Sequence, residues 1–395
     1  MNSCVIIKFL IVLSFCCCDN IRIHPDSEKL PKNKDVNYSY DLQNAQDKYF
    51  DKFDLSNDVK SISQIGSDTL QTNQYFGLLP SQFDIDYKGF IYVLQWTTST
   101  INVYDSLGVF HYQIGRQGRG PGEFLKPSTF SFDSEYNTLY VLDWPEVEIY
   151  KRIDNRFVHD SSFTHNLVYS STICVLDDYI YINGFLSKPK RNENINQFKS
   201  INRFKLSTFE HDKSFGFEYI PISDVLNFKR ILSETFLACN QETNTVIGQL
   251  KHFPYVFGYD LEGNNKWISN IQNITNPEFT ETKGVELTLI SNVEIYNNFY
   301  PFRNVDLDEF ELIQIGQRFP PDYISDIINE RNPKMMKFSD PRYHTVLVNS
   351  KNGELSVSHK YDLIGAYKDN LLLYIEVDEN SISPENKLYV KKFKN

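Results

Sequence analysis

The chain lacks the residue patterns that build the common catalytic centres. Its eight histidines include no His-x-x-x-His or Glu-x-x-His pair, so their spacing predicts no zinc site. It also has no Gly-x-Ser-x-Gly elbow and no cysteine–histidine pairing, which are the usual signs of a nucleophilic enzyme. We therefore expect no catalytic residue, no metal site and no cofactor, and the leading hypothesis is a non-catalytic protein.

An excess of positive charge is absent as well. The 40 lysines and arginines are outnumbered by 51 aspartates and glutamates, and the formal net charge is −11 at pH 7. A nucleic-acid-binding protein needs a basic surface that neutralises phosphates. The charge balance therefore argues against a nucleic-acid partner.

Long hydrophobic runs are scarce, and the apolar run Phe9–Leu13 is too short to cross a bilayer. It follows Lys8, a combination that is typical of a secretory signal. The three cysteines that come next resemble the lipid-attachment site of bacterial lipoproteins. Cys16 follows a large residue and Cys18 a small one, so both remain candidates for the lipid. We expect residues 1–17 to be a lipoprotein signal peptide, with an ordinary signal peptide cleaved nearby as the alternative.

Cysteine is also rare beyond Cys4 and the triplet at 16–18, since only Cys174 and Cys239 of the six lie in the body of the chain. Both lie in strand-like stretches. We interpret them as two small buried hydrophobic residues, and a disulfide between them is the alternative that the sequence leaves open.

Residues 18–57 are polar and charged and have no sustained hydrophobic period. Ordering such a segment would cost backbone entropy with little burial in return. We interpret it as a tether that holds a lipid-anchored domain off the membrane.

The rest of the chain is rich in strand-forming residues, with 25 tyrosines and 30 phenylalanines in the sequence against 17 glycines and 16 prolines. An aromatic residue marks the end of each predicted third strand, at Tyr104, Tyr150, Phe204 and Tyr259, with separations of 46, 54 and 55 residues. A four-stranded antiparallel unit that recurs at roughly 40 to 50 residues is typical of a β-propeller blade.

A glycine-rich loop, Ile114–Pro127, joins the first two of these units. Its glycines allow sharp turns, and we expect Phe124 to pack between the two sheets. The loop lacks the Lys-Ser/Thr of a phosphate-binding loop. Together with the strand sequences Leu139–Asp143 and Val147–Tyr150, it resembles NHL-type propellers, most closely the six-bladed propeller lipoproteins of Bacteroidota. The resemblance covers about residues 81–163.

This resemblance implies an exported, monomeric protein that a lipid anchors to the cell envelope, at the outer membrane. The fold that we predict for residues 58–395 is all-β, a six-bladed β-propeller of four-stranded antiparallel blades. In the fifth blade we place the strands Val285–Ile290 and Glu311–Ile315.

The predicted sixth blade contains Leu371–Val377 and Lys387–Phe393 and is one strand short. An unpaired strand edge promotes aggregation, and a strand from the other end of the chain would remove it. Val59–Gly66 ends in the same Gln-Ile-Gly as Gln113–Gly115 at the end of the first unit. We therefore predict that this N-terminal strand closes the propeller.

The blade pattern is interrupted at residues 320–334. Pro321 and Asp322 suit a helix start, and apolar residues follow at helical spacing. We predict a short amphipathic helix from about 322 to 330 that packs on the propeller, or alternatively caps one mouth of its central channel.

The predicted topology brings the candidate binding residues to one rim of the propeller: Trp96, Arg116, Arg119, Glu123 and Trp144. Tryptophan and arginine are enriched where proteins or sugars are bound. We therefore predict a binding or scaffolding function with a protein or glycan partner.

Two alternatives remain at this stage. In the first, both arginines pair with Asp143 or Glu123 and only lock the first two blades together. In the second, the protein is a propeller enzyme, similar to lactonases or lyases, with a metal on the central axis.

Overall fold

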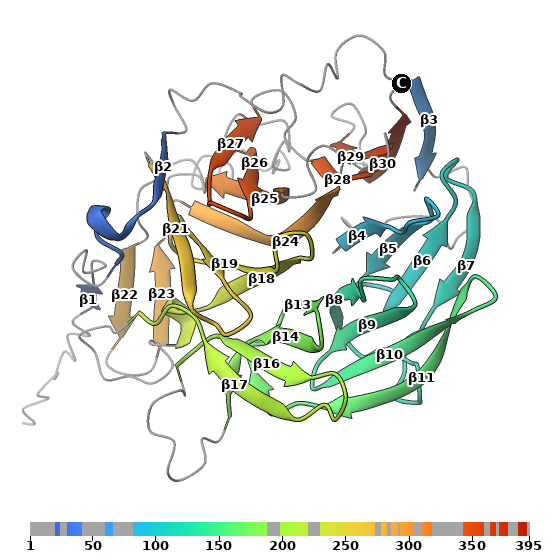
Figure 1. Cartoon of the computed structure of the whole chain (residues 1–395), viewed down its shortest axis with the longest axis horizontal. Coiled ribbons are helices and arrows are strands. Elements are labelled where there is room, and N and C mark those ends of the chain that lie inside the picture. The colour runs from blue at the N-terminus through green and yellow to red at the C-terminus, as the bar shows by residue number, and fades with distance from the viewer. Residues whose placement is uncertain are drawn as a thin grey trace, which may run out of the picture.

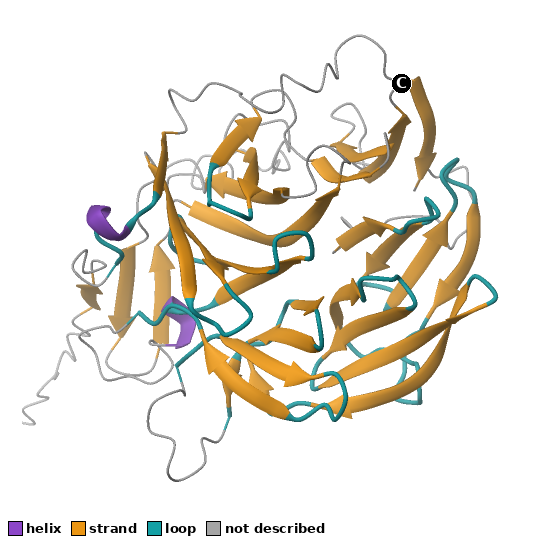
Figure 2. Cartoon of the chain, viewed as in Figure 1, coloured by secondary structure: helices purple, strands orange, loops and turns teal. Residues whose placement is uncertain are grey.

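The chain folds into an all-β propeller, in which antiparallel sheets stand in a ring (Figure 1). Strands make up nearly all of its regular structure (Figure 2). The computed structural model describes the following residues, and the statements on structure concern these alone: 20–23, 30–41, 60–65, 82–187, 198–219, 230–272, 278–282, 286–290, 293–303, 310–317, 343–358, 364–368, 371–377 and 386–392.

The strands of each of the first four blades follow in chain order, with only β15 (Phe185–Leu186) interposed in blade 3, and the first strand of each blade lies nearest the centre of the ring. Blade 1 contains β4 (Gln82–Ile85), β5 (Ile91–Gln95), β6 (Thr100–Tyr104) and β7 (Phe110–Ile114). Blade 2 contains β8 (Pro127–Phe132), β9 (Thr138–Asp143), β10 (Glu146–Ile153) and β11 (Arg156–Thr164). Blade 3 contains β13 (Ile173–Leu176), β14 (Tyr179–Asn183), β16 (Ile201–Lys205) and β17 (His211–Phe215). Blade 4 contains β18 (Thr235–Asn240), β19 (Thr245–Leu250), β20 (Tyr255–Tyr259) and β21 (Asn265–Gln272).

Blades 5 and 6 form one continuous sheet. Blade 5 contains β24 (Val293–Arg303), β25 (Phe310–Gln317), β26 (Tyr343–Asn349) and β27 (Leu355–Ser358). Blade 6 contains β28 (Ile364–Lys368), β29 (Leu371–Val377), β30 (Asn386–Lys392) and β3 (Lys60–Ile65). A short parallel contact pairs Phe302 with Tyr367 and thereby joins β24 to β28.

The N-terminal strand β3 completes blade 6, as the sequence predicts. It pairs antiparallel with β30, and Ile65 lies opposite Leu388. The outer edge of β30 is therefore hydrogen-bonded by a strand from the other end of the chain, which closes the ring.

One strand of the predicted fifth blade is assigned wrongly. The stretch expected at Val285–Ile290 forms β23 (Glu286–Ile290), which pairs with β22 (Glu278–Thr282) and not with β25. The inner strand of blade 5 is instead the longer β24, which follows β23 in the chain. The predicted helix near 322–330 lies outside the described residues.

The described part of the expected tether is not a free linker. Strand β1 (Asn20–Ile23) pairs with β22, and after the 3-10 helix η2 (Asn33–Asp35) strand β2 (Tyr38–Asp41) adds a parallel fifth strand to β21. Leu30 and Tyr40 are buried in the core clusters of the propeller. Sequence analysis overlooked these two apolar residues because the rest of the segment is polar.

The aromatic markers lie on the third strands of blades 1 to 4, at Tyr104, Tyr150, Phe204 and Tyr259, which confirms the predicted repeat. The turns that follow Tyr104 and Tyr259 have glycines with φ of +77°, at Gly108 and Gly263. Such turns need a residue without Cβ at that position.

Each hydrophobic cluster fills the space between two neighbouring blades. One cluster joins Leu94 and Val103 of blade 1 to Phe130 and Val141 of blade 2, and three others repeat this arrangement up to blade 5. Because both faces of blade 2 are covered in this way, all six residues of β9 are buried. A blade depends on its neighbours for its stability.

Polar side chains of the inner strands add hydrogen bonds between blades. Ile173 N donates to Thr129 Oγ1 at 3.1 Å, and Val175 N donates to Ser131 Oγ at 3.2 Å, so β8 is bonded to β13. One blade further on, Leu237 N of β18 donates to Thr172 Oγ1 at 3.1 Å. These bonds satisfy backbone donors that face the neighbouring blade and have no partner in their own sheet.

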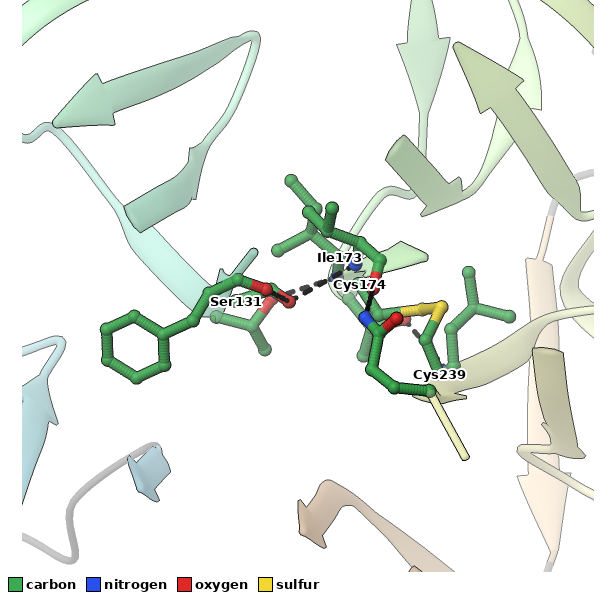
Figure 3. Close-up of a disulfide and its surroundings, with 10 residues drawn as sticks. Ser131, Ile173, Cys174 and Cys239 are labelled. Carbon is green, nitrogen blue, oxygen red and sulfur yellow. Dashed lines mark hydrogen bonds between the residues drawn. A yellow bond between two sulfur atoms is a disulfide. The ribbon is translucent and has the colours of Figure 1, made fainter. Parts of the chain in front are cut away.

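A disulfide joins Cys174 of β13 to Cys239 of β18, with a Cα–Cα distance of 5.6 Å. Figure 3 shows the bond between the two inner strands, with Ser131 on the other side of β13. The expectation of two unpaired cysteines is therefore wrong. The two strands lie side by side in neighbouring blades, and a disulfide needs this proximity, which sequence spacing does not reveal.

Candidate binding rim

The strand order decides which loops share a rim. In blades 1 and 2 the turn between the second and third strands lies at the same end as the connection to the next blade. Around blades 1 and 2 this end comprises residues 96–99, 115–126, 144–145 and 165–172, which we call the connector rim.

The glycine-rich part of the connector rim is anchored by Phe124, which is fully buried. Its ring packs with Ile114 and Tyr150 between blades 1 and 2, as the sequence predicts. Burial of a phenylalanine side chain stabilises a fold by about 2 to 3 kcal/mol. The loop is therefore held by a core residue at its centre.

Hydrogen bonds fix the backbone on both sides of Phe124. Phe124 N donates to Arg116 O at 2.8 Å, and Gly118 N donates to Phe124 O at 3.1 Å. The Tyr150 hydroxyl donates to Gly122 O at 3.0 Å from the third strand of blade 2. A loop with this many internal partners presents its surface in one conformation.

Glu123 neutralises one of the two predicted arginines. Its carboxylate accepts hydrogen bonds from Gly120 N at 2.8 Å and from Arg116 Nε at 2.7 Å. The backbone hydrogen bond first, and then the arginine, lower the pKa of Glu123, so the pair is ionised at neutral pH. Arg116 and Glu123 are thus a structural pair, as the first alternative predicts.

Arg119 is different. It is exposed, and within the described ranges its guanidinium makes no ion pair. Asp143, the other carboxylate considered as its partner, instead accepts hydrogen bonds from Leu125 N, at 2.7 Å, and from Lys126 N. Burial raises the pKa of Asp143 in spite of these two bonds. The charge of Arg119 remains available on the rim.

The two predicted tryptophans are exposed on this rim. Trp96 has 55% and Trp144 has 51% of its surface accessible, and the indole Nε1 of Trp144 donates to Leu167 O at 2.9 Å. That hydrogen bond satisfies the one polar group of the side chain and orients it. What remains accessible on Trp144 is mainly apolar ring surface.

Sequence reasoning missed two members of the same surface, Leu125 and Tyr169, which are 40% and 47% exposed. The backbone of Leu125 is bonded to the turns that carry both tryptophans, because its carbonyl accepts from Ser99 Oγ and its N–H donates to Asp143. The sequence could have indicated Leu125, because it is a large apolar residue directly after the buried Phe124. We call Trp96, Leu125, Trp144 and Tyr169 the apolar strip.

The opposite rim also exposes apolar side chains, but in a different setting. The ring of Tyr87 is covered by Lys88 and Arg152, and it lies against Tyr136. Leu107 and Ile153 belong to separate strand turns of blades 1 and 2. Among the described residues, the two exposed tryptophans both belong to the connector rim.

Within the described part of the chain, no group of three or more His, Cys, Asp or Glu is placed to hold a metal ion. In that part no helix has the length and hydropathy needed to span a membrane.

Residues 43–203 match the family DUF5128, which is described as a 6-bladed beta-propeller. A search of the curated proteins found no match.

Three of the solved structures that are similar to this chain come from Bacteroides species. A member of the DUF4221 family from Bacteroides vulgatus is 12% identical, with a TM-score of 0.53 over 85% of this chain and 97% of that chain. A protein from Bacteroides fragilis is 12% identical, with a TM-score of 0.49 over 91% and 99%. A protein of unknown function from Bacteroides thetaiotaomicron is 11% identical, with a TM-score of 0.45 over 85% and 76%. The first of these supports the fold alone, and the other two add nothing to it.

Proposed function

We propose that this protein is a non-catalytic binding propeller that holds a protein or glycan partner on its connector rim. The observation that carries the proposal is the apolar strip, in which two half-exposed tryptophans lie in two turns that share the rim with a loop fixed by a buried phenylalanine. Rigid aromatic side chains give large contact areas at little entropic cost. Arg119, which lies on the same rim and makes no ion pair with any described residue, adds a donor for a polar group of the partner.

We also propose that the protein is exported and attached to the cell envelope, at the outer membrane, through a lipid on Cys16 or Cys18, and that it acts as a monomer of the NHL propeller type. The disulfide Cys174–Cys239 supports export, because such bonds persist in oxidising compartments. Mass spectrometry of the mature N-terminus tests the anchor. Loss of lipid from only one of the variants Cys16→Ser and Cys18→Ser would identify the attachment residue.

Binding is tested with immobilised protein, a glycan array and extracts of envelope proteins. Trp96→Ala and Arg119→Ala should abolish capture of the partner while the melting temperature stays within about two degrees, because both side chains are exposed. Leu107→Ala, which removes an exposed side chain from the opposite rim, is the matched control. Unchanged capture by both rim variants would refute the proposal, and a stoichiometric metal in the purified protein would favour the propeller enzyme instead.

A further inference from the structure

The two ends of the propeller differ in charge. In blades 1 to 4 the connections from the first to the second strand and from the third to the fourth lie at the end opposite the connector rim. These connections are residues 86–90, 105–109, 133–137, 154–155, 177–178, 206–210, 241–244 and 260–264. They contain eleven aspartates and glutamates and a single basic residue, Lys88. We call this end the acidic end.

The connector end has the reverse balance. Its described segments are the connector rim and, in blades 3 and 4, residues 184–187, 198–200, 216–219, 230–234 and 251–254. They contain six lysines and arginines against three glutamates, although the whole chain has a formal net charge of −11. The charges therefore form a dipole along the axis of the ring, with its positive end at the connector rim.

Turn formation explains only the acidic half of this dipole. Asp105 Oδ1, for example, accepts hydrogen bonds from Leu107 N at 2.9 Å and from Val109 N at 2.8 Å, which fixes the turn between β6 and β7. Aspartate is common in turns for this reason. The cations of the connector end have no such role in the backbone of the turns.

Half of these cations are neutralised by the three glutamates, as the pairs Arg116–Glu123, Lys199–Glu218 and Lys251–Glu234. Arg119 and Lys126 are exposed on the connector rim, and neither makes an ion pair with a described residue. The carboxylate of Asp143 is buried and accepts from the backbone of the same loop. The rim thus presents two exposed cations whose counter-charges a partner can supply.

The remaining chemistry of the rim favours a polypeptide over a sugar. Sugar hydroxyl groups need acceptors as well as donors. The carboxylates of Glu123 and Asp143 already accept hydrogen bonds from the loop backbone, and the indole N–H of Trp144 donates to Leu167 O. The rim therefore offers the apolar surface of the strip together with two cations. Carboxylate side chains interspersed with apolar ones match both features.

We propose that the connector rim binds an acidic polypeptide segment, whose carboxylates pair with Arg119 and Lys126 and whose apolar side chains cover the apolar strip. The dipole steers such a segment toward this rim, because the acidic end of the propeller repels it. This inference rests on the proposed function and specifies the partner of the same rim.

The probe is a random copolymer of glutamate and tyrosine, and a copolymer of lysine and tyrosine is its counterpart of opposite charge. Immobilised full-length protein should bind the first and not the second, with an association rate that falls about tenfold from low to physiological salt. Arg119→Glu should lower this rate about fivefold or more. Lys205→Glu is the matched control, because it makes the same change in net charge at an exposed position of the acidic end. Its rate should stay within about twofold of the wild type, since salt screens distant charges.

The melting temperature of Arg119→Glu should stay within about two degrees of the wild type, because the side chain is exposed. Equal binding of the two copolymers, binding of neither, or an unchanged rate for Arg119→Glu would overturn the acidic polypeptide. Tighter binding of phosphatidylglycerol vesicles or of polygalacturonate would overturn it in favour of a membrane or an acidic glycan. Trp96→Ala tests the rim separately, because loss of partner capture by that variant supports the proposed function even where the acidic copolymer does not bind.

Discussion

The ring of Phe124 fills the space above Gly115, where an added Cβ would lie 2.1 Å from Phe124 Cε2. Gly115 also has a φ of +72°, which is unfavourable for any residue with a Cβ. Gly115→Ala should therefore destabilise the protein by about 2 to 4 kcal/mol, because it strains the backbone and displaces a core ring. Urea unfolding measures this loss.

Gly120→Ala in the same loop is the control for that substitution. Its Cβ would meet only the flexible end of Glu123, at 3.1 Å, and its φ is not positive. We expect a change within about 1 kcal/mol. Equal losses for the two variants would show that the loop responds to any added methyl group and that the Phe124 anchor is not decisive.

The disulfide should make a large contribution to stability. It closes a loop with a sequence separation of 65 residues, and such a crosslink stabilises a fold by about 4 kcal/mol through the unfolded chain. The double variant Cys174→Ala/Cys239→Ala should unfold at a clearly lower urea concentration than the oxidised protein. A reducing agent should lower the midpoint of the wild type but leave that of the double variant unchanged. Identical midpoints for oxidised wild type and double variant would contradict the prediction.

Closure by β3 can be isolated with two truncations. A variant without residues 1–57 loses β1 and β2 but keeps β3, whereas a variant without residues 1–66 loses all three. The second should melt roughly 5 °C or more below the first, because the edge of β30 is left unpaired. Equal melting temperatures would mean that β3 does not hold the ring closed.

Stability should fall in mild acid because of His165. Burial lowers the pKa of its imidazole from 6.5 to about 4, so the unfolded chain takes up a proton at a higher pH than the folded protein does. The free energy of unfolding should therefore decrease as the pH falls from about 6.5 to about 4, by about 3 kcal/mol from this residue.

His165→Asn should flatten that part of the pH profile, and His111→Asn, on an exposed position of β7, should not. Chemical denaturation at a series of pH values measures both. A wild-type profile that is flat between pH 4 and 6.5 would contradict the assignment.

Much of the fold could be predicted because propeller blades repeat. The markers Tyr104 and Tyr150 recur at the same place in successive sheets, and Gln64-Ile65-Gly66 repeats the end of β7, which identified the closing strand. Local sequence was sufficient wherever a feature repeats from blade to blade.

The errors concern features that do not repeat. The stretch Glu286–Ile290 has strand composition, but its partners are β22 and not the blade, and pairing is not visible in composition. The disulfide depends on the alignment of β13 against β18, which sequence alone does not fix.

The candidate site likewise contains residues that the sequence could identify and residues that it could not. Trp96 and Trp144 could be found because large aromatic residues in turns are unusual. Tyr169 could not, since its exposure on the same rim is a property of the folded chain.

The parallel strand β2 has a consequence for how an anchored propeller would stand on a membrane. Leu30 is already buried in the core, only 12 residues beyond Cys18. If Cys18 carries the lipid, the chain from Cys18 to Leu30 spans at most about 40 Å, and its reach is shorter still because β1 within it pairs with β22. The body would then stay within roughly its own diameter of the bilayer, attached at the flank of blade 4, with a restricted choice of orientations toward any partner.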